Sequence, residues 1–388
     1  MPQPALLIRL RPQGPWRYGP DDGGHDRVDA LYRSDRLYSA LTLAMGQLGY
    51  LPEWLDENTH DPGIALSSLF PFLSDSLLAA PPSSLWPPPA SLLTTPNPTF
   101  LAKIRWRAAR FVPLSLIDSL LTGQPILADQ WLPDPESGCL LRRDRPSTSP
   151  FRASIRIGAP VDRLSRGGGE AYSATCVEFE PGAGLWAVAR FRDAEVESKW
   201  SGRLQAAFRL LADSGFGGGR SRGWGKAHSP EFQSGSWPGL LLPKTGRLER
   251  DNPANGGAPS LYWLLSLYSP APNDPIDWSS GDYRLTVRSG RTESAVQSGT
   301  LKKSVHMVEE GCVLAATTEP VGTAVDVAPD GFPHPVYRSG LALTVRLPVI
   351  EPRLETAPAE QEIQEEIEEI KAEEPSPLAP EPELYYEI

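Results

Sequence analysis

Residues 213–226 read Asp-Ser-Gly-Phe-Gly-Gly-Gly-Arg-Ser-Arg-Gly-Trp-Gly-Lys, and this segment decides how the 388-residue chain is interpreted. Glycine permits positive φ and close backbone approach, and successive amide groups can cradle a phosphate. Arginine adds forked charge-assisted bonds, and tryptophan offers a stacking face. The segment therefore predicts a phosphate-binding loop, with a flexible turn as the alternative. The candidate contacts are Gly217, Gly218, Gly219, Arg220, Ser221, Arg222, Gly223 and Trp224.

The pattern upstream of this loop indicates alternating strands and helices. Strands are predicted at 5–10, 151–157, 171–179 and 184–191, and helices at 36–45 and 197–212. The strands at 151–157 and 171–179 form a hairpin arm around Gly167, Gly168 and Gly169. Proline breaks the strand pattern in 62–98, which is interpreted as irregular, and 113–122 is predicted to form a short helix.

This order of elements defines the predicted fold class, an α+β protein. The sequence strand, helix, strands, helix, glycine-rich loop, strand is the βαββαβ order of a ferredoxin-like (RRM-like) fold. We therefore predict one such domain with its arm over residues 1–235 and a diverged second copy over 236–350. Residues 351–388 form an acidic tail that is predicted to be disordered.

The net charge of −11 does not exclude a nucleic-acid partner. The tail alone holds 13 Glu against Arg353 and Lys371, or −11, which leaves 35 basic and 35 acidic groups in residues 1–350. Basic patches can therefore exist on the folded body. Three scattered cysteines without CxxC spacing argue against a disulfide framework or zinc site. With no signal peptide or membrane span expected, the sequence predicts a cytoplasmic protein without cofactor or metal.

At the glycine-rich loop the chain resembles the RAMP superfamily of CRISPR-associated RNA-binding proteins. The amino terminus narrows the resemblance to the family of subunit four of the type III-A Csm effector complex. The matching segments are Gly14-Pro-Trp-Arg-Tyr-Gly-Pro-Asp and Arg27-Val-Asp-Ala-Leu-Tyr-Arg-Ser-Asp-Arg-Leu-Tyr-Ser-Ala-Leu41. Arg33 stands where that family usually has a histidine. Residues 302–311 and 334–340 resemble its carboxy-terminal segments.

The resemblance implies a non-catalytic subunit that binds guide RNA in antiviral defence. The implied partners are the 5′ repeat-derived handle of the crRNA, the large polymerase-like subunit and the neighbouring backbone RAMP subunits. The family's arm is said to press between guide bases, which brings Arg156 and Arg163 into the candidate site. The remaining candidate RNA contacts are Arg33, His25, Lys302 and Lys303.

Two alternatives belong to other functional classes. A metal-independent, guide-processing endoribonuclease could use His25 as its acid–base group. A purely structural assembly subunit would contact RNA only incidentally. Trp106, which stands among arginines, was equally consistent with base stacking and with a half-buried strand. We expect no catalytic residue and no metal site.

Overall fold

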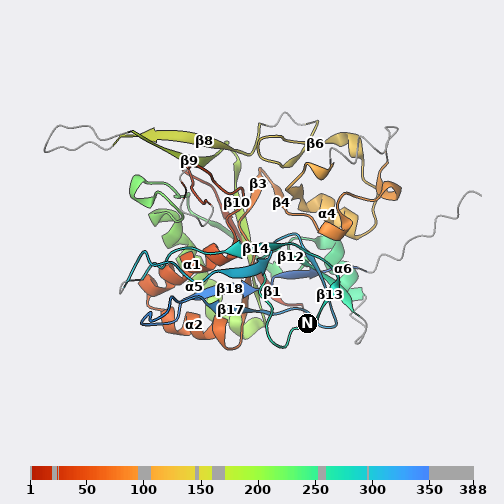
Figure 1. The fold of residues 1–388 in the computed structure, drawn as a ribbon. Coiled ribbons are helices and arrows are strands. Elements are labelled where there is room, and N and C mark those ends of the chain that lie inside the picture. The colour runs from red at the N-terminus through yellow and green to blue at the C-terminus, as the bar shows by residue number, and fades with distance from the viewer. Residues whose placement is uncertain are drawn as a thin grey trace, which may run out of the picture. The chain divides into compact units, whose positions relative to one another are not determined.

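The centre of the fold is an antiparallel sheet in which β1 (Pro4–Leu10) lies between β10 (Ala183–Phe191) and β11 (Glu231–Ser236). The strand order is β11-β1-β10-β3-β4-β5, and β2 also pairs with β10. The short strands are β2 (Ile64–Leu66), β3 (Phe70–Leu73), β4 (Ser76–Ala79) and β5 (Val112–Pro113). The computed structural model describes residues 2–19, 24, 26–94, 106–144, 148–159, 171–251, 259–294 and 297–348 (Figure 1).

Helices α1 (Ser34–Leu48) and α5 (Ala194–Ser214) pack together beside this sheet, and α2 (Leu51–Thr59) contacts α1. The buried faces of α1 and α5 are those that the sequence predicts. The buried side chains include Leu37, Tyr38, Leu41 and Met45 in α1 and Trp200, Leu204, Ala207, Phe208 and Leu211 in α5. α1 ends at Gly49, which adopts the left-handed conformation with φ of 82°. The Asp193 carboxylate caps α5 by accepting from the Val196 amide.

The interpretation of residues 62–98 as irregular is wrong for its first half, because β2, β3 and β4 lie there. The prolines that predict a break, Pro81, Pro82, Pro87, Pro88 and Pro89, all follow Ala79, where β4 ends. Beyond β4, a segment inserted into the fold carries α4 (Leu114–Leu121), which confirms the predicted short helix. It also contains η1 (Ser83–Leu85), η2 (Ala90–Leu92), η3 (Ala128–Gln130), β6 (Trp131–Pro133) and β7 (Leu140–Arg142).

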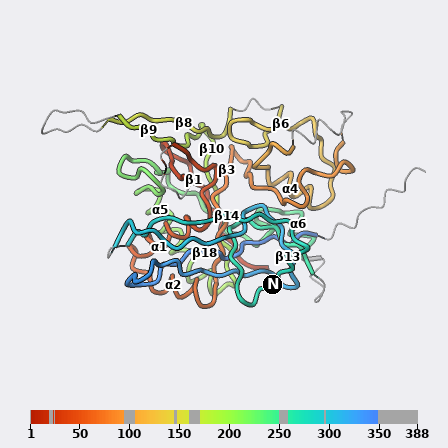
Figure 2. Tube along the Cα trace, viewed as in Figure 1, coloured from red at the N-terminus to blue at the C-terminus, as the bar shows by residue number. Residues whose placement is uncertain are grey.

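The predicted hairpin arm is confirmed over its paired strands, β8 (Phe151–Gly158) and β9 (Tyr172–Phe179). The two strands run side by side in antiparallel register and extend away from the central sheet (Figure 1, Figure 2). The predicted tip, with Arg163 and the three glycines 167–169, lies outside the described residues, as does His25.

The carboxy-terminal part holds a four-stranded sheet of order β13-β16-β12-β19 and two two-stranded sheets, β14-β15 and β17-β18. α6 (Pro243–Asp251) precedes it. The strands are β12 (Ser260–Leu264), β13 (Ile276–Asp282), β14 (Leu285–Arg288), β15 (Val305–Val308), β16 (Val313–Ala316), β17 (Gly322–Asp326), β18 (Tyr337–Leu341) and β19 (Thr344–Arg346). Trp263, Leu265 and Val345 belong to the same core cluster as β1 and α1.

The structure is therefore a mixed α/β protein with several antiparallel sheets, in agreement with the predicted class at that level. Residues 1–349 form one compact unit. The boundary predicted at residue 235 stays a prediction, and the acidic tail 351–388 lies outside the described residues. Within the described part of the chain, no helix combines the length and the apolar character needed to cross a membrane.

Candidate nucleic-acid interface

The glycine-rich loop, residues 215–225, joins α5 to β11 and is anchored by Phe216. The Phe216 ring is buried and meets Trp16 and Tyr32 edge-on, with centroid distances of 4.7 and 5.3 Å. A short 3-10 helix, η4 (Arg220–Arg222), follows, and the residues on either side of it, Gly219 and Gly223, are left-handed. The loop therefore has a defined conformation that aromatic packing supports.

The glycines are required mainly by the packing of the loop against its own surroundings. A Cβ at Gly217 would lie 2.7 Å from the Arg17 carbonyl oxygen, and one at Gly225 would lie 2.1 Å from that of Phe216. Both residues have positive φ. The sequence predicts close backbone approach to a ligand, whereas the backbone of these glycines closely approaches the protein itself.

The expected cradle of amide groups is only partly available. The amides of Gly218, Arg222 and Gly223 donate to carbonyl oxygens of residues 17, 219 and 220 at 2.7–2.9 Å, so they cannot hold a phosphate in this conformation. The amides of Gly217, Gly219, Arg220 and Ser221 have no acceptor among the described residues. A phosphate cradle within residues 217–223 would therefore rest on the amides of Gly217, Gly219, Arg220 and Ser221 in this conformation.

Two guanidinium groups beside the loop give the site its positive charge. Arg222 is exposed and has no carboxylate within ion-pair distance among the described residues. The pKa of Arg17 is lowered by burial and by the positive charge of Arg222, with a partly opposing effect of Asp26. Arg17 also has a buried Nε without a hydrogen-bond partner among the described residues. Because Arg222 helps to lower the pKa of Arg17, the two positive charges are close enough for an anion between them to be favoured.

Aromatic rings lie against the same cation. The guanidinium carbon of Arg222 is 4.5 Å from the centroid of the Tyr172 ring and 5.8 Å from that of Trp224. Tyr172 begins β9 and pairs with Gly158, so this contact connects the loop to the tip-side end of the paired strands of the arm. Sequence reasoning missed both Arg17 and Tyr172. Tyr172 could have been found as the aromatic residue next to a glycine-rich tip, and Arg17 lies within the amino-terminal match.

A cavity of about 700 Å³ opens beside the loop, between α1 and the segments 289–294 and 334–338. Arg17, Arg220 and Lys302 line it, so the structure brings Lys302 to the loop. Lys303 instead forms an ion pair with Asp330 at 2.7 Å and does not line the cavity. Arg220 is itself ion-paired with Glu293, so a phosphate would have to compete with that carboxylate.

On the arm, Arg156 is exposed and paired with Glu178. Together with Arg152, which lies 3.7 Å from the same carboxylate, it forms a basic edge on β8. The structure therefore leaves Arg156 on the surface of the arm, where an RNA strand could reach it.

The candidate contact at Arg33 must be corrected. Its side chain is only 19 % exposed and forms ion pairs with Glu309 at 3.1 Å and Glu310 at 2.7 Å. The neighbouring Asp35 is fully buried and accepts from Arg288 and Arg338. Residues 33–35 thus join α1 to the carboxy-terminal part of the unit, and Arg33 is not a plausible RNA contact in this state.

Trp106 also has a structural position. It is 3 % exposed and packs edge-on against Trp86 with a centroid distance of 5.1 Å. The Trp86 indole donates to the Trp106 carbonyl oxygen at 3.0 Å. Neither a base-stacking surface nor a half-buried strand describes this residue, because it lies inside the inserted segment.

Comparison with known proteins agrees with this fold. Residues 258–347 match the family model of the CRISPR Csm4 C-terminal domain. No curated protein sequence matches the chain significantly. A chain of the Csm3-Csm4 subcomplex of the type III-A CRISPR-Cas interference complex superposes with a TM-score of 0.55 at 15 % identity, over 88 % of this chain and 99 % of that one. A chain of a Csm1-Csm4 cassette in complex with cA4 gives 0.53 at 16 % identity, over 89 % and 98 %.

The described fold is thus shared with chains of solved Csm1-Csm4 and Csm3-Csm4 structures. Its carboxy-terminal part, residues 258–347, is similar to the Csm4 C-terminal domain.

Proposed function

We propose that this protein is a non-catalytic, guide-RNA-binding subunit of a type III CRISPR effector complex. In this role it caps the 5′ repeat-derived handle of the crRNA in the cytoplasm. The observation that carries the proposal is Arg222, which lacks a carboxylate partner among the described residues and lies against the rings of Tyr172 and Trp224. The positive charge of Arg17 is close enough to be influenced by Arg222. Single-stranded RNA is recognised by such combinations of cations and stacking faces.

The sheet order supports a ferredoxin-like first domain. The order β11-β1-β10-β3, with α1 following β1 and α5 preceding β11, is the arrangement expected of a βαββαβ unit. In this arrangement the glycine-rich loop connects the second helix to the last strand. The loop is thereby held beside the arm and the cavity by two rigid elements, which suits a binding site that must keep its geometry.

The proposed protein partners follow from the solved relatives. Chains with this fold occur in Csm1-Csm4 and Csm3-Csm4 assemblies. We infer that the present chain likewise contacts a large polymerase-like subunit and a neighbouring backbone subunit.

Binding of the purified, nuclease-treated full-length chain to a labelled handle RNA tests the proposal. Arg222→Ala should lower the affinity by about tenfold at physiological salt, because a charge-assisted contact and a stacking partner are lost together. It should also reduce the slope of log affinity against log salt by about 0.7, the contribution of one phosphate contact on a single strand.

Arg209→Ala is the matched control. Arg209 is also an exposed arginine over an aromatic ring, 5.1 Å from the Phe232 centroid, but it lies on α5 away from the loop. Equal affinity of the wild type for a scrambled RNA, or an Arg222→Ala variant that binds as tightly as Arg209→Ala, would refute the handle-binding role.

The endoribonuclease alternative is tested in the same sample. Its candidate His25 lies outside the described residues, so the structure adds nothing for or against it. Metal-independent cleavage of a precursor RNA that is abolished by His25→Ala would favour the enzyme over the binding subunit.

A further inference from the structure

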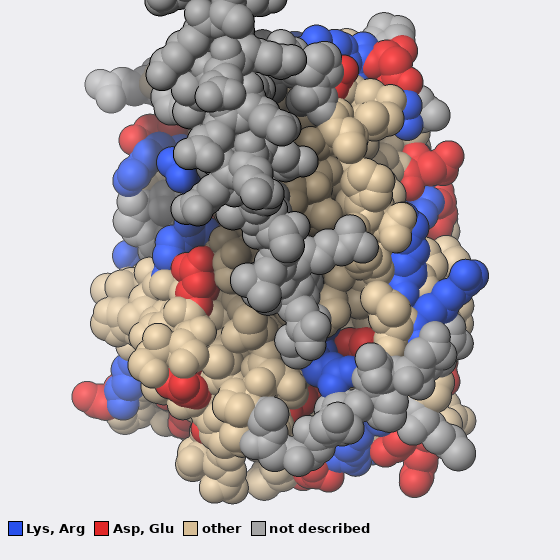
Figure 3. Space-filling view, turned by 90° about the vertical axis from the view of Figure 1, so that its right-hand side faces the viewer, with Lys and Arg blue, Asp and Glu red and all other residues tan. Residues whose placement is uncertain are grey.

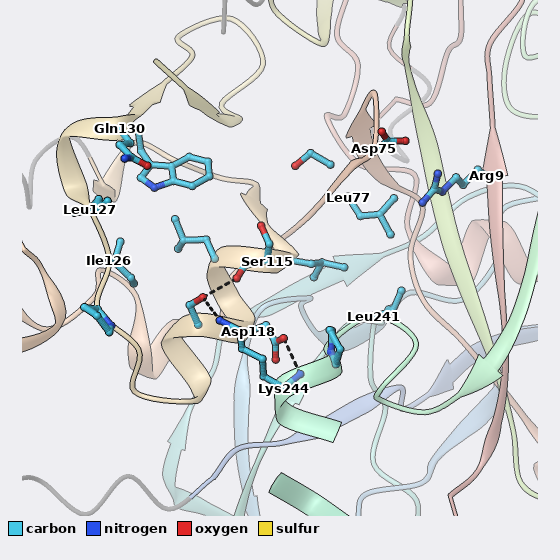
Figure 4. Close-up of a pocket in the computed structure, with 17 residues that line it drawn as sticks. Arg9, Asp75, Leu77, Ser115, Asp118, Ile126, Leu127, Gln130, Leu241 and Lys244 are labelled. Carbon is cyan, nitrogen blue, oxygen red and sulfur yellow. Dashed lines mark hydrogen bonds between the residues drawn. The ribbon is translucent and has the colours of Figure 1, made fainter. Parts of the chain in front are cut away.

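A second cleft of about 550 Å³ lies between the inserted segment and the central sheet. Its lining shares no residue with the cavity beside the glycine-rich loop. One wall is formed by α4 and residues 125–131, and the other by β1 and β4. Figure 4 shows Leu127 and Gln130 on one side of this cleft and Arg9 and Asp75 on the other, with Ser115 between them.

The lining of the cleft combines aliphatic side chains with polar and charged ones. Leu77, Leu114 and Ile126 contribute to its surface, and Leu127 is 50 % exposed. Trp131 adds an aromatic face to the same wall. A concave surface of this size, with apolar side chains in its lining, is suited to an inserted apolar side chain.

Two cations at the cleft have no ion-pair partner among the described residues. Arg9 lies on β1 and is half-buried. The carboxylate of Glu231 forms an ion pair with Arg11 at 2.8 Å rather than with Arg9. Arg9 is nevertheless close enough to help Arg11 lower the pKa of the Glu231 carboxyl. The Lys244 ammonium group donates to the Ser119 hydroxyl at 3.0 Å and meets no carboxylate at ion-pair distance. These two cations leave room for an incoming negative charge.

The acidic residues of the cleft do not cancel this charge. Asp118 is buried and accepts from the amides of Lys244 and Thr245 at 3.0 and 2.9 Å, so it acts as the cap of α6. Asp75 stands on the turn between β3 and β4. A ligand that fits must therefore combine an apolar group with a carboxylate placed near Arg9 or Lys244.

We propose that this cleft docks a segment of a neighbouring protein subunit, which inserts an apolar side chain flanked by an acidic residue. The inference rests on the proposed membership of an effector complex. A protein is favoured over RNA because aliphatic side chains within residues 114–116 and 126–131, together with the Trp131 ring, line the cleft, where an apolar side chain can be buried. On the face that Figure 3 turns toward the viewer, basic side chains are also interspersed with acidic ones where grey atoms do not cover them. RNA interfaces, by contrast, gather positive charge.

The test compares two leucines of nearly equal exposure. Leu127 lines the cleft, whereas Leu132 is 46 % exposed and does not line it. The full-length chain is co-expressed with the other subunits and the guide RNA, and the purified assembly is analysed by native mass spectrometry. We expect Leu127→Asp to lower the occupancy of one neighbouring subunit by about tenfold and Leu132→Asp to leave it unchanged. Lys244→Glu should weaken the same subunit by several-fold.

The outcomes separate this inference from the proposed function. Wild-type occupancy in both Leu127→Asp and Lys244→Glu would overturn the docking site while leaving the complex membership intact. A wild-type chain that joins no subunit would overturn both. Weaker handle binding by the isolated Lys244→Glu chain, with assembly unchanged, would show that the cleft holds nucleic acid instead. Equal thermal melting of the two leucine variants confirms that folding does not explain the difference.

Discussion

The guanidinium carbon of Arg222 lies 4.5 Å from the centroid of the Tyr172 ring. Arg222 belongs to the glycine-rich loop and Tyr172 to the first position of β9, so one cation–π contact connects the two parts of the proposed RNA site. The residues are 50 positions apart in the sequence. The affinity for a base that stacks on either side chain should therefore depend on the positions of both the loop and the arm.

This contact predicts coupling between the two residues in RNA binding. Tyr172→Ala and Arg222→Ala should each lower the handle affinity by roughly five- to thirtyfold, because each removes a stacking face or a cation. The double variant should lose less than the product of the two effects, since each single change already breaks the shared contact. A double-mutant cycle of dissociation constants measures this coupling, and strict additivity would contradict it.

Alanine substitutions at two glycines of the loop separate the cost of a strained backbone conformation from the cost of a steric clash. Gly223 and Gly225 have φ of 80° and 78°, but a Cβ would meet nothing within 4 Å at Gly223 and would overlap the Phe216 backbone at Gly225. Gly223→Ala should cost about 1–2 kcal/mol of unfolding free energy, the value for left-handed backbone alone. Gly225→Ala should cost clearly more. Urea unfolding of both variants checks the difference, and equal losses would contradict it.

Asp35 predicts a defined acid sensitivity. Burial opposes its ionisation, but the guanidinium groups of Arg288 and Arg338 hold its pKa at about 2, below the ordinary 3.8. A lowered folded pKa contributes stability that is present above pH 3.8 and is lost as the pH falls through about 2. Asp35→Asn should cost about 3–5 kcal/mol at pH 7, because two buried arginines lose their carboxylate.

Urea titrations between pH 2 and 7 measure the unfolding free energy of the wild type and of Asp35→Asn across the range in which the Asp35 carboxyl titrates. The variant should lack the part of the acid dependence that Asp35 supplies. Asp213→Asn, at an exposed position on α5, is the control and should behave as the wild type. A neutral-pH stability of Asp35→Asn equal to that of the control would show that the buried cluster contributes nothing.

Substitution of Arg33 distinguishes a role in stabilising the fold from a role in binding RNA. Arg33→Ala leaves Glu310 buried without its main cation, since burial already raises the pKa of that carboxyl and Arg33 opposes the rise. We expect a loss of about 3 kcal/mol in unfolding free energy and an unchanged handle affinity of the folded protein. A variant of normal stability with weakened RNA binding would restore Arg33 to the RNA site.

The local sequence pattern was sufficient to predict the helices that bury one regular face. The 3.6-residue spacing of Trp200, Leu204 and Leu211 predicts the buried face of α5, and Gly49 marks the end of α1. The short strands β2, β3 and β4 were missed because strands of three or four residues carry too little alternation. β2 and β3 form by pairing with β10, which lies more than 100 positions further along the chain, and β4 pairs with β3 and β5.

The sequence by itself determined the glycine-rich loop, its position between a helix and a strand, and the kind of ligand its residue types suit. The tertiary structure alone decided which side chains are available there. Ion pairs with Glu309, Glu310 and Asp330 occupy Arg33 and Lys303, whereas Arg222 lies against the Tyr172 ring. The physical reason is that residue type sets the charge of a side chain, but the partner that neutralises it is supplied by distant segments that only folding brings together.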